Sequence, residues 1–260
     1  MNCKNCDTNL IPDASFCNDC GGKVIHKRLT IKNLLIHVSE TFFNYDNKFL
    51  QTIIKLFTDP KDVIDGYVKG VRKKYIDPLG FFAISLTLSG LYFFLIKNYF
   101  PNIFDFMMVT SDSNTQMLTQ KIIEPLIEYN SLMYFMFIPL AGLMSYLIFI
   151  NKHYNFTEHI VIYFYTLPLL SNMSIILNML VYLIYPKILL SFSVFYFIGF
   201  FIYMGYVLTR IFSLSAKQLI IKTLIFLPFF FMVYIIISIA TVILLILFGQ
   251  VTLEDFEPPS

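Results

Sequence analysis

The stretch LIFLPFFFMVYIIISIATVILLILF, residues 224–248, decides the fold class of this protein. It has no charged side chain, and an α-helix needs about 20 apolar residues to cross the hydrocarbon core of a bilayer. Inside lipid every backbone N–H and C=O must be paired within its own element, so the run predicts a transmembrane helix. The composition agrees, since 57% of the 260 residues are hydrophobic and 14% are charged. A typical soluble domain is about a quarter charged, so an ordinary soluble protein is excluded.

Four further apolar runs of similar length precede this one, and together they predict an all-α integral membrane protein with five transmembrane helices. The predicted spans are residues 79–97, 132–150, 160–184, 188–208 and 224–248. We expect the membrane domain to cover residues 78–250 and to be followed by an acidic tail at residues 251–260.

Lysine and arginine residues are concentrated on one side of the predicted membrane domain. Of the 19 in the chain, 16 lie before the first span or in the segments 151–159 and 209–223, and 3 lie in the opposite segments. Because basic residues accumulate in cytoplasmic loops, this asymmetry predicts a cytoplasmic N-terminus and an extracytoplasmic C-terminus. The predicted location is the plasma membrane, crossed several times.

The N-terminal region, residues 1–28, carries the only four cysteines of the chain. Cys3 and Cys6 form one Cys-x-x-Cys pair, and Cys17 and Cys20 form a second pair ten residues later. This double spacing predicts a zinc ribbon with a structural Zn²⁺ ion, because four thiolates leave no open position for a catalytic water. Two disulfides are the alternative, but they require an oxidising compartment, which the cytoplasmic orientation disfavours.

Residues 29–77 form a separate region between the predicted ribbon and the first span. Apolar residues recur there every three or four positions, a pattern typical of amphipathic helices, and Asp59 with Pro60 predicts a helix start. We place residues 60–74 on the cytoplasmic bilayer surface, with a small soluble helical layer as the alternative. For residues 31–57 the pattern leaves both placements open.

A basic cluster of Arg72, Lys73 and Lys74 directly precedes the first span. Together with His159 and Arg210, on the same side of the membrane, it predicts a pocket for a phosphate or an anionic lipid head group, walled by two tyrosines. The alternative is that the cluster only enforces the orientation of the spans. The candidate lipid- or ligand-binding residues are Tyr67, Arg72, Lys73, Lys74, Tyr75, Asp77, Glu158, His159, Asn172, Asn178 and Arg210.

Two of these residues stand where the third predicted span begins. Glu158 lies three residues after Asn155, a spacing that predicts a helix capping box and accounts for Glu158 without any catalysis. For His159 we expect a hydrogen bond either to a backbone carbonyl or to Asp77.

Several weak motifs resemble an uncharacterised bacterial membrane family, domain of unknown function 3667. They are the double Cys-x-x-Cys knuckle, the pattern Y-x-x-G-x-R-K-x-Y at residues 67–75, Pro78 before the first span, and Glu158-His159. The resemblance implies a zinc-ribbon, multi-pass protein of the bacterial inner membrane, and it implies no reaction. The overall plan is also similar to that of five-span membrane proteins of the Yip type.

No catalytic motif of the common hydrolase, metalloprotease or nucleotide-binding classes occurs, so no catalytic residue is predicted. The favoured function is non-enzymatic: the ribbon and amphipathic helices recruit or sense a cytoplasmic protein or a lipid surface. The alternative is a carrier or flippase with a polar cavity bounded by Asn172, Asn178 and His159. Hydrogen bonds between helices also explain the two asparagines. A membrane-embedded enzyme ranks third. Membrane lipids are expected partners, and nucleic acid is not, because the ribbon has no basic stripe.

Overall fold

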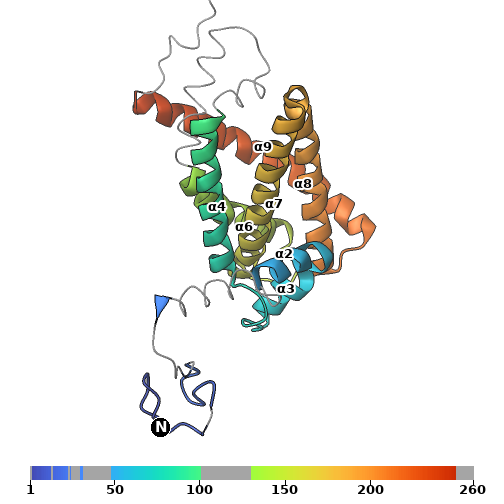
Figure 1. Ribbon diagram of the computed structural model, residues 1–260. Helices are drawn as coiled ribbons and strands as arrows, with labels where there is room; N and C mark the ends of the chain where they lie inside the picture. Colours follow the sequence, from blue (N-terminus) through green and yellow to red (C-terminus); the bar gives the residue numbers. More distant parts are fainter. Residues whose placement is uncertain are drawn as a thin grey trace, which may run out of the picture. The chain divides into compact units, whose positions relative to one another are not determined.

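The computed structural model describes residues 2–12, 14–22, 24, 30–31, 48–100 and 130–249 (Figure 1). The chain divides into two compact units, Met1–Asn47 and Lys48–Ser260. Among the described residues the longer regular elements are all helices, and one isolated antiparallel bridge joins Asn2 to Asn9. The prediction of an all-α protein is confirmed for these residues. The predicted tail at 251–260 lies outside them.

The second unit contains seven α-helices and one short 3-10 helix within its described residues. They are α2 (Lys48–Thr58), α3 (Pro60–Val68), α4 (Pro78–Tyr99), α6 (Asn130–Ile148), α7 (Phe156–Ile184), η3 (Pro186–Ile188), α8 (Leu189–Phe212) and α9 (Ala216–Leu247).

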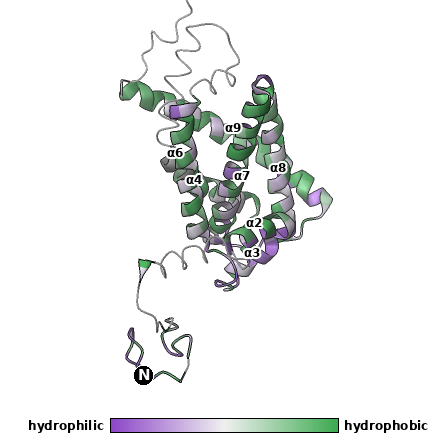
Figure 2. Ribbon diagram, viewed as in Figure 1, coloured by the Kyte–Doolittle hydropathy of each residue, from purple (hydrophilic) through white to green (hydrophobic). Residues whose placement is uncertain are grey.

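Four helical segments among the described residues are long and apolar enough to cross a membrane. They are Pro78–Ile96, Phe156–Ile184, Pro186–Phe212 and Ala216–Leu247. A shorter apolar segment, Phe135–Ile148, belongs to α6. Figure 2 shows that hydrophobic residues dominate the long helices, whereas the hydrophilic residues of this unit gather around α3 and at the helix ends. This architecture fits an all-helical membrane protein.

Helix α7 is the central element of the second unit. It packs against α6, α4 and α8, and also against the short helices α2 and α3. Its first half carries most of its buried residues, and among them Ile162 and Tyr165 are completely buried. Gly142 permits the close approach of α6, because a Cβ at this position would lie 2.8 Å from Cγ1 of Ile160 and 3.3 Å from its Cα.

Side chains cap the N-termini of α7 and α4. Asn155 and Glu158 form the predicted capping box of α7, with hydrogen bonds of 2.9 and 2.8 Å to backbone amides. Asp77 accepts a hydrogen bond of 2.8 Å from the Gly80 amide at the start of α4. Helix α3 has Pro60 in its first turn, as predicted, but Asp59 at its N-cap makes no capping hydrogen bond.

Helices α2 and α3 belong to the same compact unit as the long apolar helices. They lie within the region 29–77, for which the sequence predicts amphipathic helices. Both short helices pack against the larger ones: α3 contacts α7 and α8, and α2 contacts α7.

Candidate functional site

The first candidate site is the cysteine cluster of the N-terminal unit. The four Sγ atoms all lie within 4.8 Å of one another. Cys3 and Cys20 are 3.6 Å apart at their sulfur atoms, and so are Cys6 and Cys17. A tetrahedral ion with metal–sulfur bonds of about 2.3 Å would hold its ligands about 3.8 Å apart. The arrangement is therefore compatible with one metal ion bound by four thiolates.

Two similar backbone turns bring the cysteines together. The Asp7 amide donates to the Cys3 carbonyl at 2.9 Å, and the Gly21 amide donates to the Cys17 carbonyl at 3.0 Å. Asp7 and Gly21 each follow the first cysteine of a pair by four residues, and both have a positive φ, 57° and 68°. Gly22 is needed for a different reason, because a Cβ there would lie 2.5 Å from the side-chain nitrogen of Asn5. Both glycines thus serve the tight turns expected from the sequence.

The electrostatics of the cluster favour a bound cation. Hydrogen bonding with Thr8 lowers the pKa of the Cys6 thiol to about 6. The backbone amide of Gly22 also favours the thiolate of Cys20, yet the neighbouring thiols of Cys6 and Cys3 raise the pKa of Cys20 to about 12. Four thiolates this close repel one another, so a divalent cation is the group that lets all four ionise. Such a site supports folding and leaves no coordination position for a substrate.

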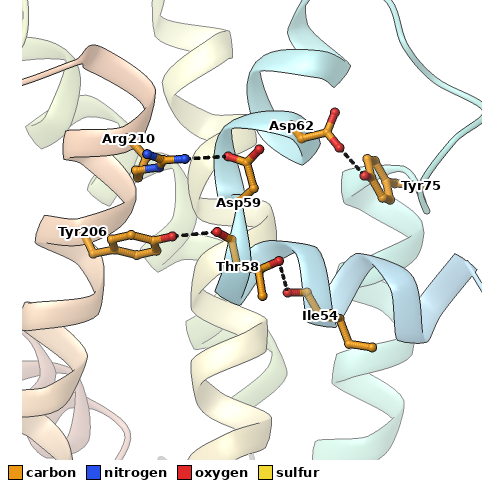
Figure 3. Close-up of polar contacts among 7 residues, drawn as sticks. All are labelled: Ile54, Thr58, Asp59, Asp62, Tyr75, Tyr206 and Arg210. Carbon is orange, nitrogen blue, oxygen red and sulfur yellow. Dashed lines mark hydrogen bonds and ion pairs between the residues drawn. The ribbon is translucent and has the colours of Figure 1, made fainter.

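The second candidate site is a polar layer around α3. Three aspartates recur there every three residues, at Asp59, Asp62 and Asp65. The carboxylate of each one pairs with side chains from a different segment of the second unit. Asp59 forms an ion pair of 3.3 Å with Arg210 on α8 (Figure 3). Because the two side chains are 40% and 51% exposed, this pair contributes little to stability.

Asp62 and Asp65 connect α3 to the segments that precede α4 and α7. Asp62 accepts from Lys74 at 2.7 Å and from the Tyr75 hydroxyl at 2.5 Å. Asp65 accepts from Lys69 at 2.7 Å and from the Tyr154 hydroxyl at 2.8 Å. The carboxylate of Asp65 is only 11% exposed, so these bonds replace the water that it loses on folding.

The pKa values of both carboxyl groups lie below their usual range. For Asp62 the main cause is the hydrogen bond from Lys74, followed by that from Tyr75. For Asp65 burial acts in the opposite direction, but the hydrogen bonds from Lys69 and Tyr154 outweigh it. Both carboxylates are therefore held in the charged form.

The basic residues of the predicted pocket contact aromatic rings and acidic side chains. Arg72 lies over the ring of Tyr67, with 5.2 Å from Cζ to the ring centroid, and Lys74 lies over the ring of Tyr75 at 5.1 Å from Nζ. Lys74 and Arg210 have the acidic partners described above. Arg72, Lys73 and Lys74 are exposed. Lys74 and Arg210 are thus neutralised by aspartates of the polar layer around α3.

His159 is completely buried. Its Nδ1 atom lies 2.9 Å from the Ser145 hydroxyl, so neither of the expected partners, a backbone carbonyl or Asp77, binds this ring nitrogen. Ring contacts with Tyr146, Tyr154 and Phe212 surround the imidazole. His159 therefore belongs to the helix-packing interior, whereas Asp77 caps α4.

The polar residues of α7 bind neighbouring helices. Asn178 donates to Ser174 and accepts from Ser193 on α8 at 2.9 Å. Asn172 accepts from Ser89 on α4 at 3.5 Å. His159 and Asn178 are separated by about 28 Å along α7, since each residue advances the helix by about 1.5 Å. These residues therefore lie at different depths and do not line one compact site.

Sequence reasoning missed the pairing role of the three aspartates. Asp59 with Pro60 predicted only a helix start, and neither Asp62 nor Asp65 was predicted to pair with another segment. Their spacing of three residues along one short helix was the available signal. Their partners could not be inferred, because Tyr154 and Arg210 are 89 and 151 residues away in sequence from Asp65 and Asp59.

Comparison with known proteins gives one match. A family model described as "Protein of unknown function (DUF3667)" matches residues 46–90. No curated protein and no solved structure matches the chain. The matched residues contain α2, α3, all three aspartates and the first half of α4, whereas the cysteine cluster lies outside them. In this segment the chain is similar to a family of unknown function, as the motifs at residues 67–78 predicted.

Proposed function

We propose that this protein is a non-enzymatic, multi-pass membrane protein whose zinc-binding head recruits a cytoplasmic protein to the inner membrane of a bacterium. The observation that carries the proposal is the closed cluster of four cysteines, which organises a small N-terminal unit in a chain rich in membrane-spanning helices. Zinc is the proposed ion because it prefers four thiolate ligands in tetrahedral geometry.

The proposed topology has five spans, an N-terminus in the cytoplasm and a C-terminus outside. Helix α6 supplies the span additional to the four long apolar segments, since its 19 residues are close to the length that a bilayer requires. The excess of lysine and arginine before the first span supports the orientation. In the proposed orientation the cysteines lie in a reducing compartment, which favours metal binding over disulfides.

A protein partner suits the surface of the head better than nucleic acid does. Ile11 and Phe16 are apolar side chains that are 65% and 57% exposed on the cysteine-bearing unit. Apolar and aromatic side chains are typical of the centre of a protein interface. Anionic lipids are proposed as further partners, because Arg72, Lys73 and Lys74 are exposed directly before α4.

A carrier function receives less support. The polar side chains of α7 that would line a transport path form hydrogen bonds with α4, α8 and α6. Packing between membrane helices is the ordinary role of such residues.

A photo-crosslinking amino acid placed at Ile11 of the full-length chain in cells tests the recruitment proposal. We expect an adduct with a cytoplasmic protein, and we expect it to disappear when Cys6 and Cys20 are both replaced by Ser, because the head then loses its metal and its shape. The matched control carries the same amino acid at Asn18, an exposed polar position of the same unit. An adduct of equal yield at both positions, or one that survives loss of the cysteines, would contradict the proposal.

A further inference from the structure

Helix α2 has three faces of different chemistry. Its residues are turned by about 100° from one to the next. The face toward the protein contains Thr52 and Leu56, which are both completely buried. The second face is an apolar ridge of Leu50, Ile54 and Phe57, which are 54%, 50% and 40% exposed.

The third face of α2 is polar and carries Lys48, Gln51 and Lys55. Its centre lies about 125° around the helix from the centre of the apolar ridge. A helix packed on a soluble protein needs one buried face and one polar face. The extra apolar ridge of α2 therefore requires a second apolar environment.

Contacts with α4 place the N-terminal half of α2 at the edge of the membrane core. The Thr52 hydroxyl accepts a hydrogen bond of 3.2 Å from the amide of Ile76, two residues before α4. The ring of Phe49 lies 5.6 Å from that of Phe81, in the first turn of α4. The apolar segment Pro78–Ile96 has 19 residues and is about 28 Å long, close to the thickness of the hydrocarbon core, so its first turn lies near the boundary.

Contacts with α8 place the C-terminal end of α2 at the same depth. Figure 3 shows the hydroxyl of Tyr206 donating to the Thr58 carbonyl, at 3.0 Å, and Tyr203 donates to the Leu56 carbonyl at 2.9 Å. The segment Pro186–Phe212 is about 40 Å long, about 10 Å more than the hydrocarbon core. Because the charged Arg210 lies in its last turn, we place this excess, about two turns, at that end. These tyrosines therefore stand near the boundary, beside Ile202, which is 69% exposed.

The same tyrosine hydrogen bonds pair backbone carbonyls at the C-terminal end of α2, and lipid requires such pairing. The last carbonyls of a helix have no partner within it and are costly to bury unpaired. Tyr203 and Tyr206 supply partners for two of these carbonyls, at Leu56 and Thr58. The Asp59 amide donates to a third, at Lys55, so most of the carbonyls at the end of α2 are paired without water.

We propose that α2 is an interfacial helix whose ridge of Leu50, Ile54 and Phe57 inserts among the acyl chains of the cytoplasmic leaflet. At its C-terminal end the ridge reaches α8, where the ring of Phe57 lies 5.4 Å from that of Tyr203. With the ridge in the acyl chains, Lys48 and Lys55 on the polar face are available to head-group phosphates. This inference requires that α4 and α8 cross the membrane and that their ends beside α2 lie on the cytoplasmic side. It does not depend on zinc or on a protein partner.

Tryptophan fluorescence tests the proposal cleanly, because the chain contains no tryptophan. The variants Ile54→Trp and Lys55→Trp place the probe on adjacent residues, about 100° apart around α2. In vesicles of lipids brominated in the acyl chain, we expect Ile54→Trp to emit at shorter wavelength and to be quenched by bromine. Lys55→Trp should instead be quenched by aqueous iodide.

Two reference variants make every outcome decisive. Ile202→Trp, on the exposed surface of α8, reports full exposure to lipid, and Leu50→Trp repeats the ridge test if Ile54→Trp misfolds. Iodide quenching of the ridge probe as strong as that of Lys55→Trp would overturn the proposal, because the ridge would then face water. Protection from both quenchers would also overturn it, because a second copy of the chain or another protein would then cover the ridge.

Discussion

Replacing both Cys6 and Cys20 by Ser should reduce bound zinc from one ion per chain to none and unfold the N-terminal unit. Each substitution removes a thiolate from a different sulfur pair, so two of the four ligands are lost. Structural zinc sites of this type contribute roughly 10–16 kcal/mol to small domains, far more than any single contact in the chain. A segment of this size buries too little apolar surface to compensate for that loss.

Elemental analysis of the full chain purified in detergent gives the zinc content, and limited proteolysis gives the state of the head. The matched control is Asn18→Ser, which introduces the same side chain at an exposed position between the ligands Cys17 and Cys20. The control should keep one ion per chain and the wild-type cleavage rate. A metal-free wild-type protein with two disulfides would contradict both the metal site and the cytoplasmic location of the head.

Replacing Asp65 by Ala should destabilise the second unit by about 1.5–3 kcal/mol. The change leaves the Tyr154 hydroxyl without its acceptor and Lys69 without its ion-pair partner. Hydrogen bonds to charged groups are worth about that much when the acceptor is buried. Asp59→Ala on the same helix is the matched control, and it should cost no more than about 1 kcal/mol because its pair with Arg210 is exposed.

Denaturant titration in mixed micelles measures both changes, and a double variant tests the mechanism. Adding Tyr154→Phe to Asp65→Ala should cost less than the sum of the two single changes, because the hydroxyl left unpaired is then absent. An equal loss of stability in Asp59→Ala and Asp65→Ala would contradict the prediction, because burial of the carboxylate would then not increase the free energy that its hydrogen bonds contribute.

The pH dependence of the same variants follows from the pKa of Asp65. Because this pKa is lower in the folded protein than in the unfolded chain, the carboxylate contributes its stability above the unfolded value of about 3.9. That contribution is lost as the pH falls through the lower, folded pKa. The difference in stability between wild type and Asp65→Ala should therefore shrink in acid below about pH 4.

Local features of the structure were predictable, because their causes lie within a few residues. The capping box of Asn155 and Glu158 depends on a spacing of three residues, and the metal site depends on two short turns. The long apolar helices follow from composition alone. These features need no knowledge of how the helices pack.

Contacts between distant segments were not predictable from one sequence. His159 was expected at a polar position, but its partner Ser145 lies on another helix and three aromatic rings enclose it. The tyrosine that binds the Leu56 carbonyl is 147 residues away. Any of several tyrosines and aspartates could have formed such bonds, and only the packing of α2 and α3 against the spans selects among them.

The central claim is that the metal-binding head lies in the cytoplasm and that an odd number of spans follows it. Reporter fusions at the two ends of the chain test this claim most directly. A reporter that is active only outside the cytoplasm should be inactive when fused before Met1 and active when fused after Ser260. The matched pair uses a reporter that is active only in the cytoplasm, and it should give the opposite result at each end. Both ends on the same side would contradict five spans, and a head outside the cytoplasm would contradict the proposed recruitment of a cytoplasmic protein.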